Sequence, residues 1–234
     1  MRTSVRVGLT SLGLLTLLLA GCSAFPTEGA TRVSPDPSAS PSGGGETSEP
    51  VEEVGTLPPA DLTFAAGADL AQGEWIAGWN DQLMATDSRF TLSSPDDGNG
   101  SWAYLDAQTQ CVVSFYQGAI TDLALGADDR ESTDNMLAAV LGELIPGVTA
   151  ADVSANAVDD AVAQSVQAGT VDVRVVIGTT ADGGTWGDFG RTFGTLGTSL
   201  FVNVECPSGQ DASTEISALF DQYLAVVVSS TSTE

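Results

Sequence analysis

Hydrophobic and polar residues alternate along several stretches of the chain, and this alternation predicts strands. It is clearest in residues 171–178 (VDVRVVIG) and 199–206 (SLFVNVEC), where every second residue is apolar. Shorter stretches at 89–94, 101–105 and 110–118 predict three more strands, and the turn cluster PDDGNG separates the first two of these.

Three other segments have apolar residues at helical spacing. The clearest has a candidate N-cap at Ser132 and a stop at Pro146-Gly147. Its apolar stripe contains Met136, Val140 and Leu144, with Leu137 and Leu141 beside it.

The first and last of these helical segments are less regular. A first helix is predicted from Leu70, Ile76, Trp79 and Leu83, although Gly73 and Gly78 weaken it. A last helix is predicted after Asp211, from the positions of Ile216, Leu219, Phe220, Tyr223 and Val227.

Two further stretches have no clear period. Residues 153–169 (VSANAVDDAVAQSVQAG) fit either a strand or a helix, and the glycine series GDFGRTFGTLG is interpreted as tight turns between strands. Strands in two groups, each followed by a helix, predict an α+β fold. We therefore expect a mainly antiparallel sheet packed with helices, in a single globular domain over residues 61–234.

The N-terminal segment has the composition of an export signal. The positive stretch MRTSVR precedes the apolar run VGLTSLGLLTLLLA, which is as long as a signal-peptide core and shorter than the roughly 20 residues of a membrane-spanning helix. The run ends in Leu19-Ala20-Gly21-Cys22, which resembles the lipobox of bacterial lipoproteins.

That resemblance implies a signal peptide over residues 1–21 and a diacylglycerol on the Cys22 thiol. It also implies cleavage just before Cys22 and acylation, for example by palmitate, of the new terminus. The expected location is the extracytoplasmic face of the cell membrane. Two alternatives stay open, namely an ordinary signal peptide with a coincidental cysteine and an uncleaved anchor.

Residues 22–60 are predicted to be a disordered tether behind this lipidated cysteine. Seven of the ten prolines lie here, among Ser, Gly, Thr and Glu. Such a stretch has too few large apolar residues to bury a core. Its composition also permits O-glycosylation.

The charged residues exclude several classes of function. The seven basic residues are all Arg, against 31 acidic residues, and the chain has no His and no Lys. Without its first two arginines the chain carries five Arg and a net charge of −26, so nucleic acid is not an expected partner. Without His or Lys, Ser-His-Asp catalysis, His-ligated zinc and Schiff-base chemistry are impossible. We expect no metal and no cofactor.

Cys111 and Cys206 remain once Cys22 is assigned to lipid. Each shares its strand face with apolar neighbours, and an even number of cysteines in an exported domain favours a disulfide. The alternative is a pair of free, buried thiols.

Carboxylate chemistry is the catalytic option that survives. The acidic clusters are Asp96-Asp97, Asp128-Asp129 with Glu131, and Asp159-Asp160. Most of these positions are typical of turns and caps, where Asp accepts backbone N–H bonds, so structural roles are expected. The oxygens of Asp97, Asn99 and Ser101 resemble only part of a Ca²⁺ loop.

Aromatic residues are the remaining candidates for binding. Trp75 and Trp79 stand four residues apart, and Trp102, Tyr104 and Trp186 lie in or near predicted hairpins. Exposed rings of this kind stack on sugars or hold apolar ligands, whereas buried ones belong to the core. The sequence favours the core and leaves the ligand-binding residues unknown.

Beyond the lipobox, two segments carry a fainter resemblance. These are RFTLSSPDDGNGSWAYLDAQTQCVVSFYQG and the strand leading into VECPSG with its closing helix. Their element order resembles PsbP-like domains, including those on actinobacterial lipoproteins, and the likeness covers most of residues 61–228. It implies α/β/α layering and non-catalytic work.

The sequence therefore predicts a membrane-anchored, non-catalytic lipoprotein that binds a small ligand or assists an envelope protein complex. One alternative is a carboxylate-dependent hydrolase acting on envelope polysaccharide. Another is a purely structural surface protein.

Overall fold

The computed structural model describes residues 57–70, 74–96, 98–119, 121 and 123–231, all within one compact unit, Glu52–Glu234. Its elements in chain order are η1 (Ala66–Asp69), β1 (Trp75–Asp81), α1 (Leu83–Thr86), β2 (Phe90–Ser94), β3 (Ser101–Asp106), β4 (Val112–Ala119), α2 (Asp129–Leu144), α3 (Ala150–Asn156), β5 (Val158–Gln164), β6 (Gly169–Thr179), β7 (Thr185–Phe193), β8 (Thr198–Cys206), α4 (Ala212–Ala218), η2 (Leu219–Tyr223) and β9 (Leu224–Ser230). Among these residues no helix has the length and apolarity needed to cross a lipid bilayer.

The nine strands form one mixed sheet in the order β1-β9-β5-β6-β7-β8-β4-β3-β2. Neighbouring strands are antiparallel except β5 and β9, which are parallel. The predicted α+β fold with a mainly antiparallel sheet is confirmed at this level.

The sheet curls until its β1 edge reaches strands near the opposite edge. The backbone N–H of Trp79 on β1 donates to Oε1 of Gln117 on β4 at 2.8 Å. The Asp81 carboxylate accepts bonds from Trp102 Nε1 at 3.1 Å and from the Tyr104 hydroxyl at 2.9 Å. Hydrogen bonds that involve side chains, rather than regular backbone pairing between strands, therefore connect β1 to β3 and β4.

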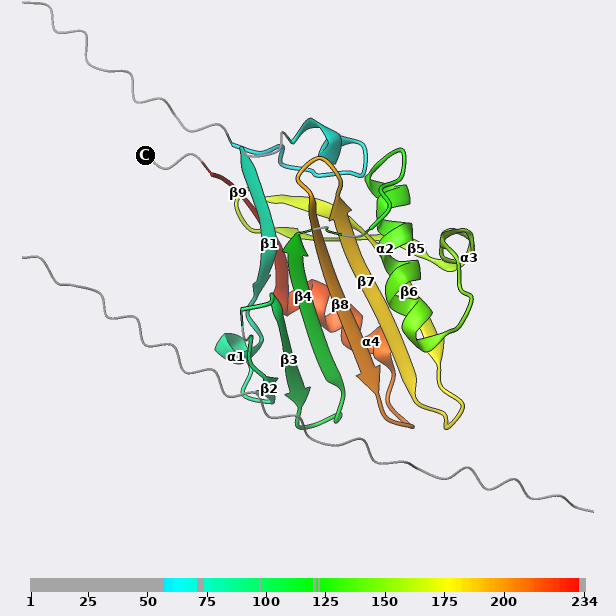
Figure 1. Cartoon of the computed structure of the whole chain (residues 1–234). Coiled ribbons are helices and arrows are strands. Elements are labelled where there is room, and N and C mark those ends of the chain that lie inside the picture. The colour runs from blue at the N-terminus through cyan, green and yellow to red at the C-terminus, as the bar shows by residue number, and fades with distance from the viewer. Residues whose placement is uncertain (1–56, 71–73, 97, 120, 122, 232–234) are drawn as a thin grey trace, which may run out of the picture. The chain divides into compact units, whose positions relative to one another are not determined.

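The alternation of side chains gives each face of the sheet its own core. The larger core fills the inside of the curl, where α4 and η2 pack, and includes Phe115, Phe189 and Val202. The smaller core lies between the opposite face and α2, and includes Met136 and Phe201. Figure 1 shows α2 and α4 on opposite faces of the central strands.

Buried ion pairs fix α2 on the sheet. Arg174 on β6 is fully buried and contacts Asp134 of α2 and Asp159 of β5, each at 2.7 Å. Arg191 on β7 is also fully buried and contacts Asp129 of α2 at 2.8 Å. Buried charges persist where they are paired in this way.

Arg191 also binds the segment that enters the domain, an arrangement we term the Arg191 clamp. Its guanidinium donates to the carbonyl oxygens of Leu62 at 3.3 Å and Thr63 at 3.0 Å. Leu62 is bonded to β6 through the Thr170 carbonyl at 2.8 Å. The chain therefore attaches to the sheet centre before it reaches the edge strand β1.

The predicted helix through Leu70, Ile76, Trp79 and Leu83 is wrong, because residues 75–81 form β1 and α1 covers only Leu83–Thr86. Trp79 is buried while Ile76 is 57% exposed. This fits an edge strand with one face on the core. Gly73 lies outside the described residues, and Gly78 lies within β1.

The interpretation of GDFGRTFGTLG as turns is wrong for residues 187–193, which belong to β7 near the sheet centre, and is confirmed for residues 194–197, which form the turn to β8. Two glycines in β7 allow a helix to pack closely on each face of the sheet. A Cβ on Gly190 would stand 2.8 Å from Met136 Cε of α2, and one on Gly187 would overlap Ile216 of α4. Glycine occupies both positions because side chains of the two helices pack directly against the β7 backbone.

The remaining differences lie at element ends. The last helix ends at Tyr223, and the β-branched run after it forms β9, so Val227 belongs to a strand. The ambiguous segment divides into α3 and β5. The N-cap of α2 is Asp128 rather than Ser132, and Leu144 in the predicted stripe is 62% exposed.

Candidate functional site

The structure tests the prediction for Cys111 and Cys206 but not the one for the anchor at Cys22. Cys22 and its lipobox lie outside the described residues. Cys111 and Cys206 form a disulfide that joins β8 to the residue just before β4. Both cysteines are buried in the larger core, on the strand faces that their apolar neighbours indicated.

The acidic clusters have structural partners. Asp128 caps α2 through the Glu131 N–H at 2.8 Å, and Asp96 accepts bonds from the N–H groups of Gly98 and Gly100. Asp159 contacts two arginines, whereas Asp97 lies outside the described residues.

The aromatic candidates divide between core and surface. Trp75, Trp79, Trp102 and Tyr104 pack in or against the larger core, where Trp102 stacks on Phe115 with ring centroids 5.1 Å apart. Trp186 is partly buried against the smaller core and also lines a pocket.

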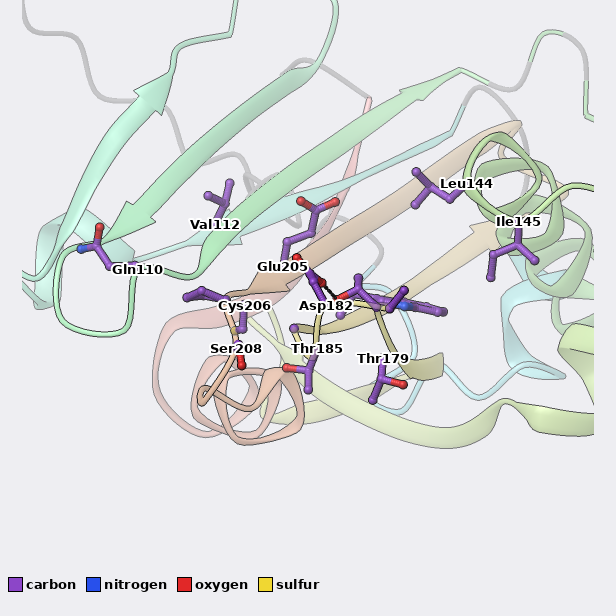
Figure 2. Close-up of a pocket in the computed structure, with 15 residues that line it drawn as sticks. Gln110, Val112, Leu144, Ile145, Thr179, Asp182, Thr185, Glu205, Cys206 and Ser208 are labelled. Carbon is purple, nitrogen blue, oxygen red and sulfur yellow. Dashed lines mark hydrogen bonds between the residues drawn. The ribbon is translucent and has the colours of Figure 1, made fainter. Parts of the chain in front are cut away.

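We call this cavity, of about 700 Å³, the Trp186 pocket. It opens where the end of α2 meets β4, β8 and the β6–β7 turn (Figure 2). Its lining residues are Gln110, Val112, Leu144, Ile145, Thr179, Thr180, Ala181, Asp182, Gly184, Thr185, Trp186, Glu205, Cys206, Pro207 and Ser208.

One row of the sheet forms the floor of the Trp186 pocket. Glu205 on β8 pairs with Val112 on β4 and, on its other side, with Trp186 on β7. Trp186 in turn pairs with Gly178 on β6. A Cβ on Gly178 would overlap the Trp186 indole. The glycine therefore lets the indole lie close against the strand.

Apolar and acidic groups meet above this floor. In Figure 2 the Glu205 carboxylate lies between Val112 on one side and Leu144 and Ile145 on the other. Leu144 and Ile145 are 62% and 43% exposed, because α2 ends there instead of burying them. Exposed apolar side chains in a concave site are available to an apolar ligand.

The β6–β7 turn supplies the second acidic group. The Thr180 hydroxyl donates to the Asp182 carboxylate, and a hydrogen bond with Gly184 adds to this. These bonds hold the pKa of Asp182 below its ordinary value, so the carboxylate is ionised at neutral pH. Gly183 has φ of +87°, a conformation that favours glycine in the turn.

Asp188 lies two residues along β7 from Trp186, on the same α2-covered face, between Val176 and Asn203. It is fully buried, and burial raises its pKa to about 6 despite a 2.8 Å bond from Asn203 Nδ2 to its Oδ1. Its Oδ2 has no hydrogen-bond partner. The charge of Glu205 adds to the rise.

Part of this site was accessible from the sequence. Trp186 was among the aromatic candidates, and the polar position of Glu205 follows from the alternation in SLFVNVEC. Asp188 was missed because its segment was assigned to turns. Leu144 and Ile145 were missed because their exposure depends on where α2 ends relative to the sheet.

Within the described residues, no group of three or more His, Cys, Asp or Glu side chains is arranged to hold a metal ion. Comparison of the chain with family models, with curated proteins and with solved structures gave no match.

Proposed function

We propose that this protein is a lipid-anchored, extracytoplasmic lipoprotein without catalytic activity, and that its domain binds a small molecule in the Trp186 pocket. The pocket itself carries this proposal. A cavity of about 700 Å³ lies within the size range of small-molecule sites, and its lining combines Trp186 and exposed aliphatic side chains with a few polar groups.

The anchor rests on the resemblance of residues 19–22 to a lipobox and on the Cys111–Cys206 disulfide, which is typical of exported domains. Each buried CH₂ of an acyl chain contributes about 0.8 kcal/mol, so two or three chains give stable attachment. Replacing Cys22 by Ala is expected to move the protein out of the detergent-extracted membrane fraction or to leave its signal segment uncleaved. Unchanged fractionation and unchanged mass would contradict the anchor.

The acidic groups near the pocket support a non-catalytic role. A glycosidase needs a general acid whose pKa is raised and which reaches the substrate. Asp182 has a lowered pKa, and Asp188 has a raised pKa but is fully buried. The helices on both faces of the sheet also accord with the α/β/α layering that a PsbP-like domain implies.

The hydrolase alternative keeps one supporting observation, since Asp182 and Glu205 line the same pocket. Incubation with the host's envelope polysaccharide and assay of new reducing ends tests it. Activity that disappears in Glu205→Gln would favour the hydrolase over the binding protein.

Native mass spectrometry of the protein purified from its own host tests small-molecule binding. The expected result is a retained mass that the Ser208→Trp variant lacks. This substitution fills the pocket from its exposed rim without removing a core side chain. The matched control is Thr214→Trp, a similar change at an exposed position outside the pocket lining. An empty wild-type pocket would argue against a carrier.

A further inference from the structure

The charged side chains that line the Trp186 pocket are all acidic. They are Asp182 and Glu205, and the lining contains no Arg, in a chain that has no Lys or His. An anionic ligand would therefore meet only repulsion from the charged side chains here. The hydrogen bonds to Asp182 keep that carboxylate ionised over the physiological range.

The C-terminal end of α2 adds to this negative potential. The helix runs for 16 residues to Leu144 and has no basic residue in its last turn. A helix of this length carries about half a negative charge at its C-terminus. Leu144 and the C-cap residue Ile145 both line the pocket, so this helix end lies at the pocket wall.

No arginine of the described domain is free to balance these charges. Arg89, Arg130, Arg174 and Arg191 each form an ion pair with at least one carboxylate, as their salt bridges show. Arg174 and Arg191 are also fully buried. The described part of the chain therefore supplies no unpaired cationic side chain that could neutralise the pocket.

The rest of the lining disfavours a bare metal ion. Ca²⁺ takes six to eight oxygen ligands, and no cluster of acidic groups suited to a metal occurs among the described residues. Trp186, Leu144 and Ile145 instead offer aromatic and aliphatic surface. An indole ring also attracts cations through its electron-rich face.

We infer that the Trp186 pocket binds an organic cation with an apolar body, such as a substituted ammonium ion. This inference rests on the proposed binding function and names its ligand class. Trp186, Leu144 and Ile145 contact the apolar body. Glu205, Asp182 and the end of α2 face the positive charge.

Three probes of similar size but different charge test the inference. They are 3-phenylpropyltrimethylammonium, 3-phenylpropan-1-ol and 3-phenylpropanoate, each titrated into the purified full chain. Binding is followed by the Trp186 indole N–H resonance, assigned with Trp186→Phe, and by calorimetry. The cation is expected to bind about tenfold more tightly than the alcohol, and the anion to bind more weakly than either.

The Glu205→Gln variant tests how much the Glu205 charge contributes to affinity, because glutamine has nearly the same shape as glutamate. It is expected to lower the affinity for the cation about threefold to tenfold and to leave the affinity for the alcohol unchanged, because the charge it removes faces the ligand. The control Asp221→Asn removes an exposed charge outside the pocket lining and should change neither affinity.

The outcomes distinguish the two proposals. If the alcohol binds as tightly as the cation and Glu205→Gln changes neither, the pocket binds neutral apolar ligands and the cation inference is overturned while small-molecule binding stands. If none of the three probes shifts the Trp186 resonance at millimolar concentration, both the cation inference and the assignment of this pocket are overturned.

Discussion

The most informative single substitution in this domain is Asp188→Asn, because it removes a buried charge without changing shape. Asp188 is fully buried, and burial raises the pKa of its carboxyl from 3.8 to about 6. A rise of about two units corresponds to a free-energy difference on the order of 3 kcal/mol between the protonated and ionised forms. The protonated form is the one that the fold favours.

The pH dependence follows from the sign of this shift. The folded protein binds the Asp188 proton more tightly than the unfolded chain does, so the stability from this group is present in full below pH 3.8. That stability is lost as the pH rises to about 6. At pH 8 the wild type therefore holds a buried carboxylate whose Oδ2 has no hydrogen-bond partner.

An asparagine at this position reproduces the protonated carboxyl at every pH. Its carbonyl oxygen can accept the bond from Asn203 Nδ2, and its amide group replaces the unpartnered oxygen. We expect Asp188→Asn to match the wild type near pH 4. At pH 8 it should be more stable by up to about 3 kcal/mol, which for a domain of this size raises Tm by about 6–12 °C.

Urea and thermal unfolding at pH 4, 6 and 8 measure this difference. The control Asp221→Asn removes an exposed charge from the same acidic chain and corrects for general self-repulsion. Asn203→Ala should have the opposite effect to Asp188→Asn, with a larger loss of stability at pH 8 than at pH 4. A difference between Asp188→Asn and wild type that is the same at pH 4 and pH 8 would refute the reasoning.

Further predictions concern packing and cross-linking. Gly67→Ala is expected to lower the free energy of unfolding by about 1–3 kcal/mol, because its Cβ would overlap the Asp129 carboxylate in the Arg191 clamp. Gly142→Ala in α2 should instead raise it by up to about 1 kcal/mol, since its nearest contact is 4.0 Å away; equal effects in thermal unfolding would contradict this contrast. Replacing both Cys111 and Cys206 by Ala opens a covalent link between residues 95 positions apart and should cost up to about 4.7 kcal/mol in urea unfolding. An unchanged urea midpoint would mean that the disulfide does not restrain the unfolded chain.

The strands that alternate regularly were predictable from the sequence. Residues 171–178 and 199–206 lie in β6 and β8, because the period of two along each is undisturbed and one face supplies valines to the larger core. The disulfide was expected from the even number of remaining cysteines together with this alternation, which placed Cys111 and Cys206 on core faces. The two strands, in contrast, depend on local pattern alone.

The errors came from residues whose partners are distant in the sequence. Gly187 and Gly190 indicate turns by local rules, yet they lie in β7 because α4 and α2 pack against them. Trp75 and Trp79 have helical spacing, but β1 is fixed by pairing with β9 and by the bond to Gln117. The pocket depends on the same long-range contacts, so only Trp186 among its lining residues was singled out in advance as a candidate for ligand binding.

The Arg191 clamp has a mechanical consequence for a domain held by its N-terminal side. Tension that enters the domain at Leu57 reaches Leu62 and Thr63 before it reaches β1. The load passes to β6 and β7 in the middle of the sheet, so β1 at the sheet edge is shielded from peeling. Under such tension, the bonds that residues 58–63 make with the sheet would be loaded before β1 is, and the pocket at the far end of β6 and β7 would keep its shape.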